Sequence, residues 1–359
     1  MKKKILLIES LMHFWQVSDL HKLFSKNFHC DVLVPKKYAH LIDLKHGIIT
    51  SPLKYFIFLH AIFIGKKYDY IYLVTSPEYP EFPTNLKSFL IYFQQLIVFT
   101  ILLFFFKKKI ILYIRGIYRV VPEINISKNK FYINLRKKLF LKVSRFVCEN
   151  RNLEKVFKNK FILKKRDIYL TTLYTRFFDP NQVVKKKVNN NILTIGVLGA
   201  IDPIRKDYNL LEDFVRINNS KVQLIFLGRK YKRISDPVLD KFKKYNIITK
   251  SYLTDKDFVN LGSRCHVLLS LNKEDKMYGT YKGTGSYGDA LKLQQKIICP
   301  SFTDPLNEFA DFSLYYSSKK ELESLLSKLL TDKKFFNPKF SNFSINKIRV
   351  KCFKELKLI

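Results

Sequence analysis

Short apolar runs alternate with segments of helical periodicity along most of the chain. The runs at 3–10, 29–35, 68–76 and 108–116 are apolar at most positions, and 18–28 has its apolar residues at helical spacing. Such runs are typical of parallel strands that are buried on both faces. Regular alternation of strand and helix implies right-handed crossovers, so the pattern predicts a mostly parallel sheet covered by helices on both faces.

A polar, basic stretch at 171–191 interrupts this alternation and contains Pro180, which favours a linker. Five further strands are predicted after it, at 192–200, 222–228, 246–253, 266–272 and 296–300. The predicted fold class is therefore α/β, with two tandem doubly wound, Rossmann-like parallel-sheet domains facing a cleft. Ligands of such sheets bind at the carboxyl ends of the strands, so we expect the site in that cleft.

The segment 89–106 carries no charge over 18 residues and is followed by Lys107, Lys108 and Lys109. Its length reaches the lower limit for a membrane-spanning helix. A span at this point would break the sheet, because the segment lies between two predicted strands. The favoured interpretation is a helix on the sheet whose exposed apolar face dips into a bilayer; a merely buried helix and a spanning helix stay open.

The formal charge of +35 arises from 65 Lys and Arg against 30 Asp and Glu. Three interpretations are open: binding to anionic lipid headgroups, binding to nucleic-acid phosphates, and surface charge without a dedicated partner. Apolar residues make up 47% of the chain, which argues against a disordered protein.

Five cysteines lie far apart without a C-x-x-C pair, so the sequence indicates neither a zinc site nor a disulfide framework. We expect each to be a small buried residue in a reducing compartment. His40, His46 and His60 show no metal-ligand spacing, and the first residues lack the apolar run and cleavage site of a signal peptide. We therefore expect no bound metal and a protein on the cytoplasmic side.

A loop of small residues opens the segment YKGTGSYGDALKLQQKIICP at 281–300. Backbone N–H groups of a glycine-rich loop before a helix can converge on phosphate oxygens, and the helix dipole adds positive charge. Gly283, Thr284, Gly285 and Ser286 supply such amides and two hydroxyl groups. A structural turn is the alternative, because the loop matches neither the Walker pattern nor G-x-G-x-x-G at a first strand.

The run IGVLGAIDPIRKDYNLL at 195–211 opens the same half of the chain. Gly199 ends its strand, and Arg205 and Lys206 follow in the loop before a helix. Two cations and a helix N-terminus beside a glycine loop suit a diphosphate. Solvated loop charges are the alternative interpretation.

This half resembles the donor-binding domain of GT-B glycosyltransferases, especially the retaining nucleotide-sugar enzymes of family 4. In that family the first strand leads into a glycine, an arginine and a lysine, and the arginine and the lysine bind the nucleotide diphosphate. Gly199 and Lys206 match, whereas Ala200 stands at the arginine position and Arg205 is the candidate substitute. The stretch YTRFFDPN at 174–181 also resembles the linker of that family.

The family has two glutamates, separated by seven residues around a glycine-containing loop, which contact the donor sugar and the ribose. Asp289 fits the ribose position, whereas Tyr281 occupies the first position. Glu274 or Asp275 is the candidate for the missing carboxylate. Because of this departure, retention and inversion of anomeric configuration both stay open.

The resemblance implies a nucleotide diphosphate sugar as donor substrate and no metal or other cofactor. The acidic residues of DKD at 255–257 are interpreted as the start of a helix, with Thr254 or Asp255 as N-cap, and not as a metal-binding Asp-x-Asp. The predicted donor-binding residues are Gly199, Arg205, Lys206, Tyr281, Gly283, Thr284, Gly285, Ser286 and Asp289.

Acceptor residues are expected at strand ends of the first half of the chain. Glu9 and His13 follow the first strand, Glu78 follows another, and Arg115 ends a third. A carboxylate or imidazole there would suit a general base. Capping, packing and exposed loop charge are the alternatives.

We therefore predict a cytoplasmic glycosyltransferase of hexosyltransferase type, peripheral on the inner face of the cell membrane. Its expected partners are the donor, a lipid-linked glycan acceptor of bacterial cell-surface polysaccharide or lipopolysaccharide biosynthesis, and anionic membrane, but no nucleic acid. The predicted domains are an acceptor-binding, membrane-associating domain at 1–175, a donor-binding domain at 190–340, and a helix at 341–359 that packs on the first domain. A GT-B-like nucleotide-sugar epimerase and a basic RNA-binding protein are the alternatives.

Overall fold

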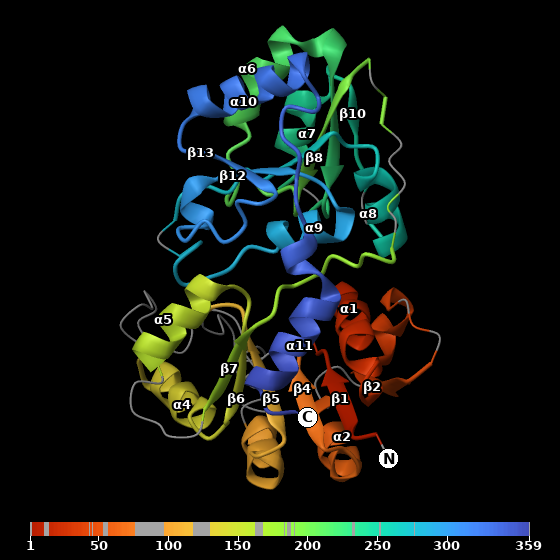
Figure 1. Ribbon diagram of the computed structural model, residues 1–359, viewed down its shortest axis with the longest axis vertical. Helices are drawn as coiled ribbons and strands as arrows, with labels where there is room; N and C mark the ends of the chain where they lie inside the picture. The colour runs from red at the N-terminus through yellow and green to blue at the C-terminus, as the bar shows by residue number, and fades with distance from the viewer. Residues whose placement is uncertain are drawn as a thin grey trace. The chain divides into compact units, whose positions relative to one another are not determined.

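The computed structural model describes most of the chain (Figure 1). The described residues are 2–10, 14–42, 44, 46–52, 57–75, 97–117, 130–161, 168–182, 184, 188–189, 191–231, 234–250, 253–275 and 277–358. Two of the predicted acceptor residues, His13 and Glu78, and the first part of the apolar segment, 89–96, lie outside these residues.

The chain folds into two compact units. Unit 1 comprises Met1–Tyr174, Tyr281–Gly283 and Asn346–Ile359, and unit 2 comprises Thr175–Thr280 and Thr284–Ile345. Each unit has its own apolar core. The chain crosses between the two units more than once, and one crossing from unit 1 into unit 2 lies inside the glycine-rich loop, between Gly283 and Thr284.

Unit 1 is built on a seven-stranded parallel sheet in the order β3-β2-β1-β4-β5-β6-β7. Its strands are β1 (Lys4–Ile8), β2 (His29–Pro35), β3 (Ile48–Ser51), β4 (Tyr70–Leu73), β5 (Ile110–Ile114), β6 (Arg145–Cys148) and β7 (Tyr169–Thr172). Its helices are α1 (Phe14–Ser25), α2 (Ile57–Ile64), α4 (Lys130–Phe140), α5 (Arg151–Phe161), α11 (Ile345–Glu355) and the helical residues 97–106.

Unit 2 is built on a six-stranded parallel sheet in the order β10-β9-β8-β11-β12-β13. Its strands are β8 (Leu193–Leu198), β9 (Val222–Leu227), β10 (Ile247–Ile248), β11 (Val267–Leu269), β12 (Ile297–Pro300) and β13 (Ser313–Tyr316). Its helices are α6 (Asn209–Ile217), α7 (Asp236–Phe242), α8 (Asp255–Gly262), α9 (Ser286–Leu293) and α10 (Lys319–Thr331).

Both sheets reverse their strand order at one point, between β1 and β4 in unit 1 and between β8 and β11 in unit 2. The central strands are buried at almost every position, as their unbroken apolar sequences predict. In doubly wound sheets the connections leave the reversal point toward opposite faces, which opens a ligand site at the carboxyl ends of the two strands. The predicted class of two doubly wound parallel-sheet domains is confirmed.

The end of β7 corrects one sequence-based boundary. Thr171 and Thr172 fall in the stretch interpreted as a linker, but they pair with Val147 and Cys148 of β6. Thr171 and Thr172 are nevertheless buried, because their hydroxyl groups donate hydrogen bonds to Glu355 and Glu154. The edge strands β3 and β13 were not predicted from the sequence either, and each is only partly buried.

The C-terminal helix α11 packs in unit 1, where Figure 1 draws it in blue beside α1. The ring of Phe353 stacks on Phe24 at 5.6 Å and meets Phe28 edge-on at 5.3 Å. Arg349 Nε donates a hydrogen bond of 2.7 Å to the carbonyl of Leu23. The residues after 345 therefore contribute to the first core. The acceptor and donor roles of the predicted domains stay predictions.

Two smaller expectations from the sequence are also confirmed. All five cysteines are buried. Thr254 is the N-cap of α8, with its hydroxyl accepting from Asp257 N at 3.0 Å and the Asp257 side chain returning to the N-cap amide. The acidic residues at this point therefore stabilise a helix start.

Candidate functional site

The loops after β8 and β11 converge at the reversal point of the sheet in unit 2. Gly199 follows β8, and Ser270 and Asn272 follow β11. Lys206 pairs with Asn272 through an antiparallel bridge, which brings the loop after β8 against the loop after β11. The position is the one at which doubly wound sheets bind their ligands.

Gly199 lets the chain turn sharply at the end of β8. Its φ of +75° suits glycine, and a side chain at the neighbouring Gly228 would collide with the carbonyl of Gly199. The Lys206 amine lies beside this turn: a Cβ at Gly199 would stand 2.9 Å from Nζ, and Nζ donates a hydrogen bond to the carbonyl of Leu198. The turn therefore places a cation at the strand end.

Lys206 is only 8% exposed, which is unusual for a lysine. Its pKa is lowered to about 7: burial is the main cause, the nearby charge of Arg205 also lowers it, and the charges of Asp289 and Asp202 oppose the shift. Desolvation disfavours the protonated form of the amine. An anion that entered next to Nζ would favour the charged form, so the amine is suited to receive a phosphate.

The glycine loop supplies hydrogen-bond donors beside this lysine. Asn272 Nδ2 donates to Thr284 Oγ1 at 3.4 Å, and Thr284 Oγ1 donates to Ser286 Oγ at 3.1 Å. Ser286 begins α9, and its hydroxyl lies 3.4 Å from that of Ser270. Apart from the chain neighbours of Gly285, no atom of the described residues lies within 4 Å of a Cβ built there, so space is open at the N-terminus of α9.

Asp289, the predicted ribose ligand, lies in the first turn of α9 and is paired with an arginine. Its Oδ1 lies 3.3 Å from Arg176 Nε, and Arg176 Nη1 donates 2.8 Å to Asp255 Oδ1. The Arg176 side chain is 6% exposed and covers the ring of Phe258 at 4.8 Å. The Asp289 side chain is 22% exposed, so it stays accessible while Arg176 holds it in place.

Arg176 escaped the sequence-based search. It belongs to the linker motif YTRFFDPN, which was interpreted as a whole, and it is a single arginine among threonines and aromatics. A cation in such an apolar context needs a carboxylate partner when it is buried. The need for a carboxylate partner was the signal that could have pointed to Arg176, but the sequence does not show which acidic residue downstream supplies this partner.

Arg205 does not share the burial of Lys206. Its Nε donates to Asp202 Oδ2 at 2.6 Å in the same loop, and its side chain is 47% exposed. The interpretation of Arg205 as a substitute for the family's arginine stays a prediction. An exposed ion pair of this kind contributes little free energy, so Arg205 would lose little stabilisation by exchanging Asp202 for a phosphate.

Tyr281 and Gly283, also predicted as donor-binding residues, belong to unit 1. Ile117 N donates to the carbonyl of Tyr281 at 2.8 Å, and Gly283 N donates to the carbonyl of Arg115 at 3.1 Å. A Cβ at Gly283 would lie 2.6 Å from the carboxylate of Glu149. The first part of the glycine loop therefore rests on the carboxyl ends of β5 and β6.

The same edge of the sheet in unit 1 carries buried polar residues. Glu9 follows β1, is fully buried, and accepts a hydrogen bond of 2.6 Å from Thr75 after β4. Arg115 follows β5, donates to Gln16, and stacks on the ring of Tyr113 at 5.4 Å. Glu9 and Thr75 thus mark the reversal point of this sheet.

Glu149 was not singled out from the sequence, although it directly follows the apolar run Phe146, Val147 and Cys148. It follows β6 and is 6% exposed, next to Gly283. The indication that would have found it is an acid directly after an apolar strand, the criterion that selected Glu9. Glu9, Arg115 and Glu149 all stand at the carboxyl edge of one sheet.

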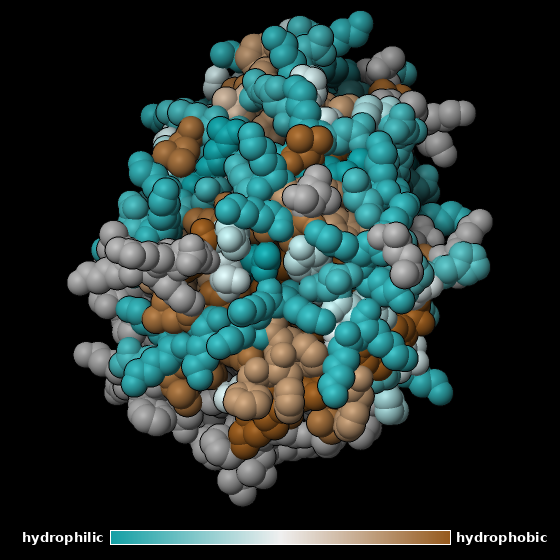
Figure 2. Space-filling view, turned by 60° about the horizontal axis from the view of Figure 1, so that its bottom comes forward, coloured by the Kyte–Doolittle hydropathy of each residue, from teal (hydrophilic) through white to brown (hydrophobic). Residues whose placement is uncertain are grey.

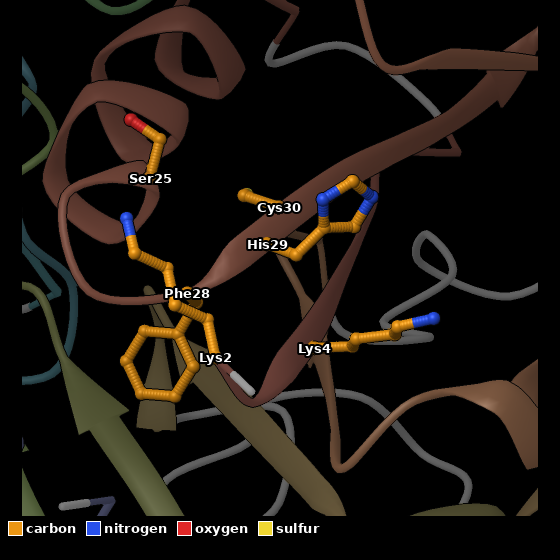
Figure 3. A pocket seen from close by; sticks show the side chains of 6 residues that line it. All are labelled: Lys2, Lys4, Ser25, Phe28, His29 and Cys30. Carbon is orange, nitrogen blue, oxygen red and sulfur yellow. The ribbon is translucent and has the colours of Figure 1, made fainter.

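A hollow of about 530 Å³ lies at the opposite, amino edge of this sheet. Figure 3 shows the six side chains around it, which come from the starts of β1 and β2 and the end of α1: Lys2, Lys4, Ser25, Phe28, His29 and Cys30. Lys2, Lys4 and His29 are exposed. Ligands of doubly wound sheets bind at the other edge, so this hollow is no candidate for the active site.

The geometry of unit 2 suits an anion of more than one phosphate. It combines a buried lysine, two hydroxyl groups and an unobstructed helix N-terminus, whose amides carry partial positive charge. Preorganised donors of this kind stabilise charge that develops on a leaving diphosphate.

No protein-family model and no curated protein sequence matches the chain. Solved structures do match. Anabaena HepE in complex with UDP and glucose is 13% identical, with a TM-score of 0.67 over 99% of this chain and 100% of that one. The lipopolysaccharide outer core galactosyltransferase WaaB is 9% identical, with a TM-score of 0.54 over 99% of both chains.

A third match is the UDP-GlcNAc 2-epimerase from Neisseria meningitidis, bound to UDP-GlcNAc, with 11% identity and a TM-score of 0.59 over 100% of both chains. At these identities the similarity concerns the fold. The chain is a GT-B fold protein, with the same two parallel-sheet domains as these nucleotide-sugar enzymes.

Proposed function

We propose that this protein is a glycosyltransferase that moves a sugar from a nucleotide diphosphate sugar to a glycan acceptor. The observation that carries the proposal is the buried amine of Lys206 at the reversal point of unit 2, beside the open N-terminus of α9. A buried cation and a helix N-terminus with open space beside Gly285 in the same unit suit a diphosphate. The neighbours in fold, which bind UDP or UDP-GlcNAc, support this ligand class.

In this proposal Lys206, Thr284, Ser286 and the first amides of α9 hold the diphosphate and stabilise it as it leaves. Asp289 accepts hydrogen bonds from the ribose, with Arg176 fixing its carboxylate. Metal-independent transfer remains part of the proposal.

Unit 1 would bind the acceptor at the carboxyl edge of its sheet. Glu9 and Glu149 are the described carboxylates there that suit a general base, and Arg115 offers a cation for a polar acceptor. A carboxylate at this edge would accept the proton of an acceptor hydroxyl as a general base. Glu78 and His13 stay candidates from the sequence.

The acceptor is proposed to be a lipid-linked glycan of bacterial cell-surface polysaccharide or lipopolysaccharide biosynthesis. WaaB, a lipopolysaccharide galactosyltransferase with the same fold, supports that setting. The protein would act on the cytoplasmic, inner face of the cell membrane. Among the described residues no helix is long and apolar enough to cross a bilayer.

The donor site can be tested with one substitution that fills open space. Gly285→Val places a branched side chain over the N-terminus of α9, at a helical φ of −64° that valine tolerates, so the fold should persist. We expect wild-type protein to be stabilised thermally by at least one of the UDP- and GDP-sugars, and Gly285→Val to lose most of this shift. Melting curves of both proteins against the panel provide the measurement.

The proposal would be contradicted if no nucleotide sugar of the panel raised the melting temperature of the wild-type protein while the protein bound RNA tightly and in a salt-sensitive way. That outcome would favour an RNA-binding protein. The epimerase alternative is favoured only by the fold match to UDP-GlcNAc 2-epimerase. It predicts that an isomeric nucleotide sugar accumulates without an acceptor, whereas a transferase releases the nucleotide when an acceptor is present.

A further inference from the structure

An apolar patch lies on unit 1, formed by two helices. Ile97, Ile101, Phe104 and Phe105 recur at helical spacing along 97–106 and are 44%, 37%, 81% and 56% exposed. Phe63 of α2 is 73% exposed. Figure 2 turns this end of unit 1 forward and shows apolar surface gathered there between polar side chains. These five residues are called the apolar patch.

The same two helices are anchored by their opposite faces. Phe99, Leu102 and Leu103 of 97–106 and Ile57 and Phe58 of α2 are buried in the core of unit 1. The apolar patch is therefore the exposed side of two helices that pack firmly on the core. An exposed patch of large apolar residues usually marks an interaction surface.

Lysines cluster where the two helices end. Lys66 and Lys67 follow α2, and Lys107, Lys108 and Lys109 follow 97–106. The ends of the two helices touch, because a Cβ at Gly65 would lie 3.1 Å from the ring of Phe106, and Lys109 Nζ donates 2.6 Å to the carbonyl of Tyr68. The lysines therefore lie at one edge of the patch. The segments 57–67 and 97–109 contain no acidic residue.

We infer that the apolar patch and its five lysines dock unit 1 onto an anionic lipid bilayer, with Phe63 and Phe104 entering the headgroup region. The inference rests on the proposed function in one respect, that the acceptor is carried by lipid. Large apolar side chains gain from leaving water, while clustered lysines attract anionic headgroups. The patch includes α2, so the surface extends beyond the segment 89–106.

A second copy of the chain is a poorer occupant. In a twofold dimer the same patch meets itself, which would bring both sets of five lysines toward each other without acidic partners in these segments. A bilayer with anionic headgroups matches both properties of the surface at once, the apolar centre and the basic edge.

The test uses the full chain and vesicles of phosphatidylcholine with or without about 30 mol % phosphatidylglycerol. We expect binding to the anionic vesicles to be about tenfold or more tighter than to pure phosphatidylcholine. The double variant Phe63→Ser/Phe104→Ser should lower it by about tenfold or more. Ile217→Ser, which changes a 75% exposed isoleucine on α6 of unit 2, is the matched control and should leave vesicle binding unchanged.

The basic edge has its own pair of variants. Lys107→Gln/Lys108→Gln should weaken binding to anionic vesicles, whereas Lys243→Gln/Lys244→Gln removes the same charge from an exposed pair in unit 2 and should not. Tryptophan fluorescence follows the insertion of residue 104 into the bilayer. The emission of Phe104→Trp should shift to shorter wavelength when vesicles are added, whereas that of Ile217→Trp should not. Melting temperatures check that each variant is folded.

Equal binding to both vesicle types, or undiminished binding of Phe63→Ser/Phe104→Ser, would overturn the inference. So would a concentration-dependent dimer that this double variant abolishes. Donor binding, measured without vesicles, separates this proposal from the proposed function: retained nucleotide-sugar binding with no vesicle binding removes the docking surface alone.

Discussion

At the scale of single residues, Lys206 is where burial and charge conflict most. Its amine is held at the end of β8, where it donates a hydrogen bond to the carbonyl of Leu198. Burial lowers its pKa to about 7, so at neutral pH the free protein holds a mixture of neutral and charged amine. An anion in the site would shift this equilibrium to the charged form.

We therefore expect proton uptake when UDP binds above pH 7. At pH 8 the free amine is mostly neutral and the bound amine charged, so binding should take up close to one proton, and affinity should fall by up to about tenfold per pH unit above 7. Titration calorimetry at pH 8 in two buffers of different ionisation enthalpy measures the uptake. Lys206→Met should bind UDP weakly and without this proton. Tight UDP binding by wild-type protein with no proton uptake would show that Lys206 is not next to the phosphate.

At the scale of elements, α9 depends on a close approach to the segment after β7. A Cβ at Gly288 would lie 2.0 Å from Thr175 Oγ1 and 2.9 Å from Arg176 N. The helix can approach this segment only because Gly288 has no side chain, and the approach also brings Asp289 against Arg176. One glycine thus sets the position of the helix that carries the proposed anion site.

Gly288→Ala should therefore destabilise unit 2 by about 1–3 kcal/mol, because the added methyl group must displace backbone and not only a flexible side chain. Gly285→Ala is the matched control, three residues earlier at the start of the same helix, where a Cβ meets open space. Urea unfolding of the two variants gives the comparison. Equal stability of both would mean that α9 moves freely away from Thr175.

At this scale, some helices and strands could be predicted from the sequence and others could not. The capping box at Thr254 and the strands at 29–35 and 108–116 were predictable, because caps and buried strands depend on neighbouring residues. The strands β3, β7 and β13 were not predicted, whereas the edge strand β10 was part of the predicted run 246–253. Each of the three is short, and its place in the sheet is set by pairing with a neighbouring strand and not by its own apolar content.

At the scale of the whole molecule, unit 1 contains both the start and the end of the chain. Residues 346–359 return to the first core, where Phe353 packs against Phe24 and Phe28 and Arg145 Nε donates to the carbonyl of Leu356. The stability of the N-terminal sheet therefore depends on residues more than three hundred positions away in the sequence.

Phe353→Ala should destabilise unit 1 by about 3–5 kcal/mol, since the ring is 1% exposed among other aromatics. Amide hydrogen exchange resolves the effect by unit: amides of β1 and β2 should lose protection, while those of β8 and β9 keep it. Val350→Ala, at a 67% exposed position of the same helix, is the control. Equal loss of protection in both sheets would contradict the assignment of α11 to unit 1.

The sequence by itself determined the kind of elements, their order and the class of fold, because apolar periodicity is a local property of the chain. It also singled out Gly199, which directly follows a strand, and Lys206 and the glycine loop; their role in donor binding stays a prediction. The tertiary structure decided which strand ends meet. Glu149 next to Gly283, Arg176 between Asp255 and Asp289, and the apolar patch of α2 with 97–106 join residues far apart in sequence. Their proximity follows from the order of strands in each sheet, which no local pattern of apolar and polar residues specifies.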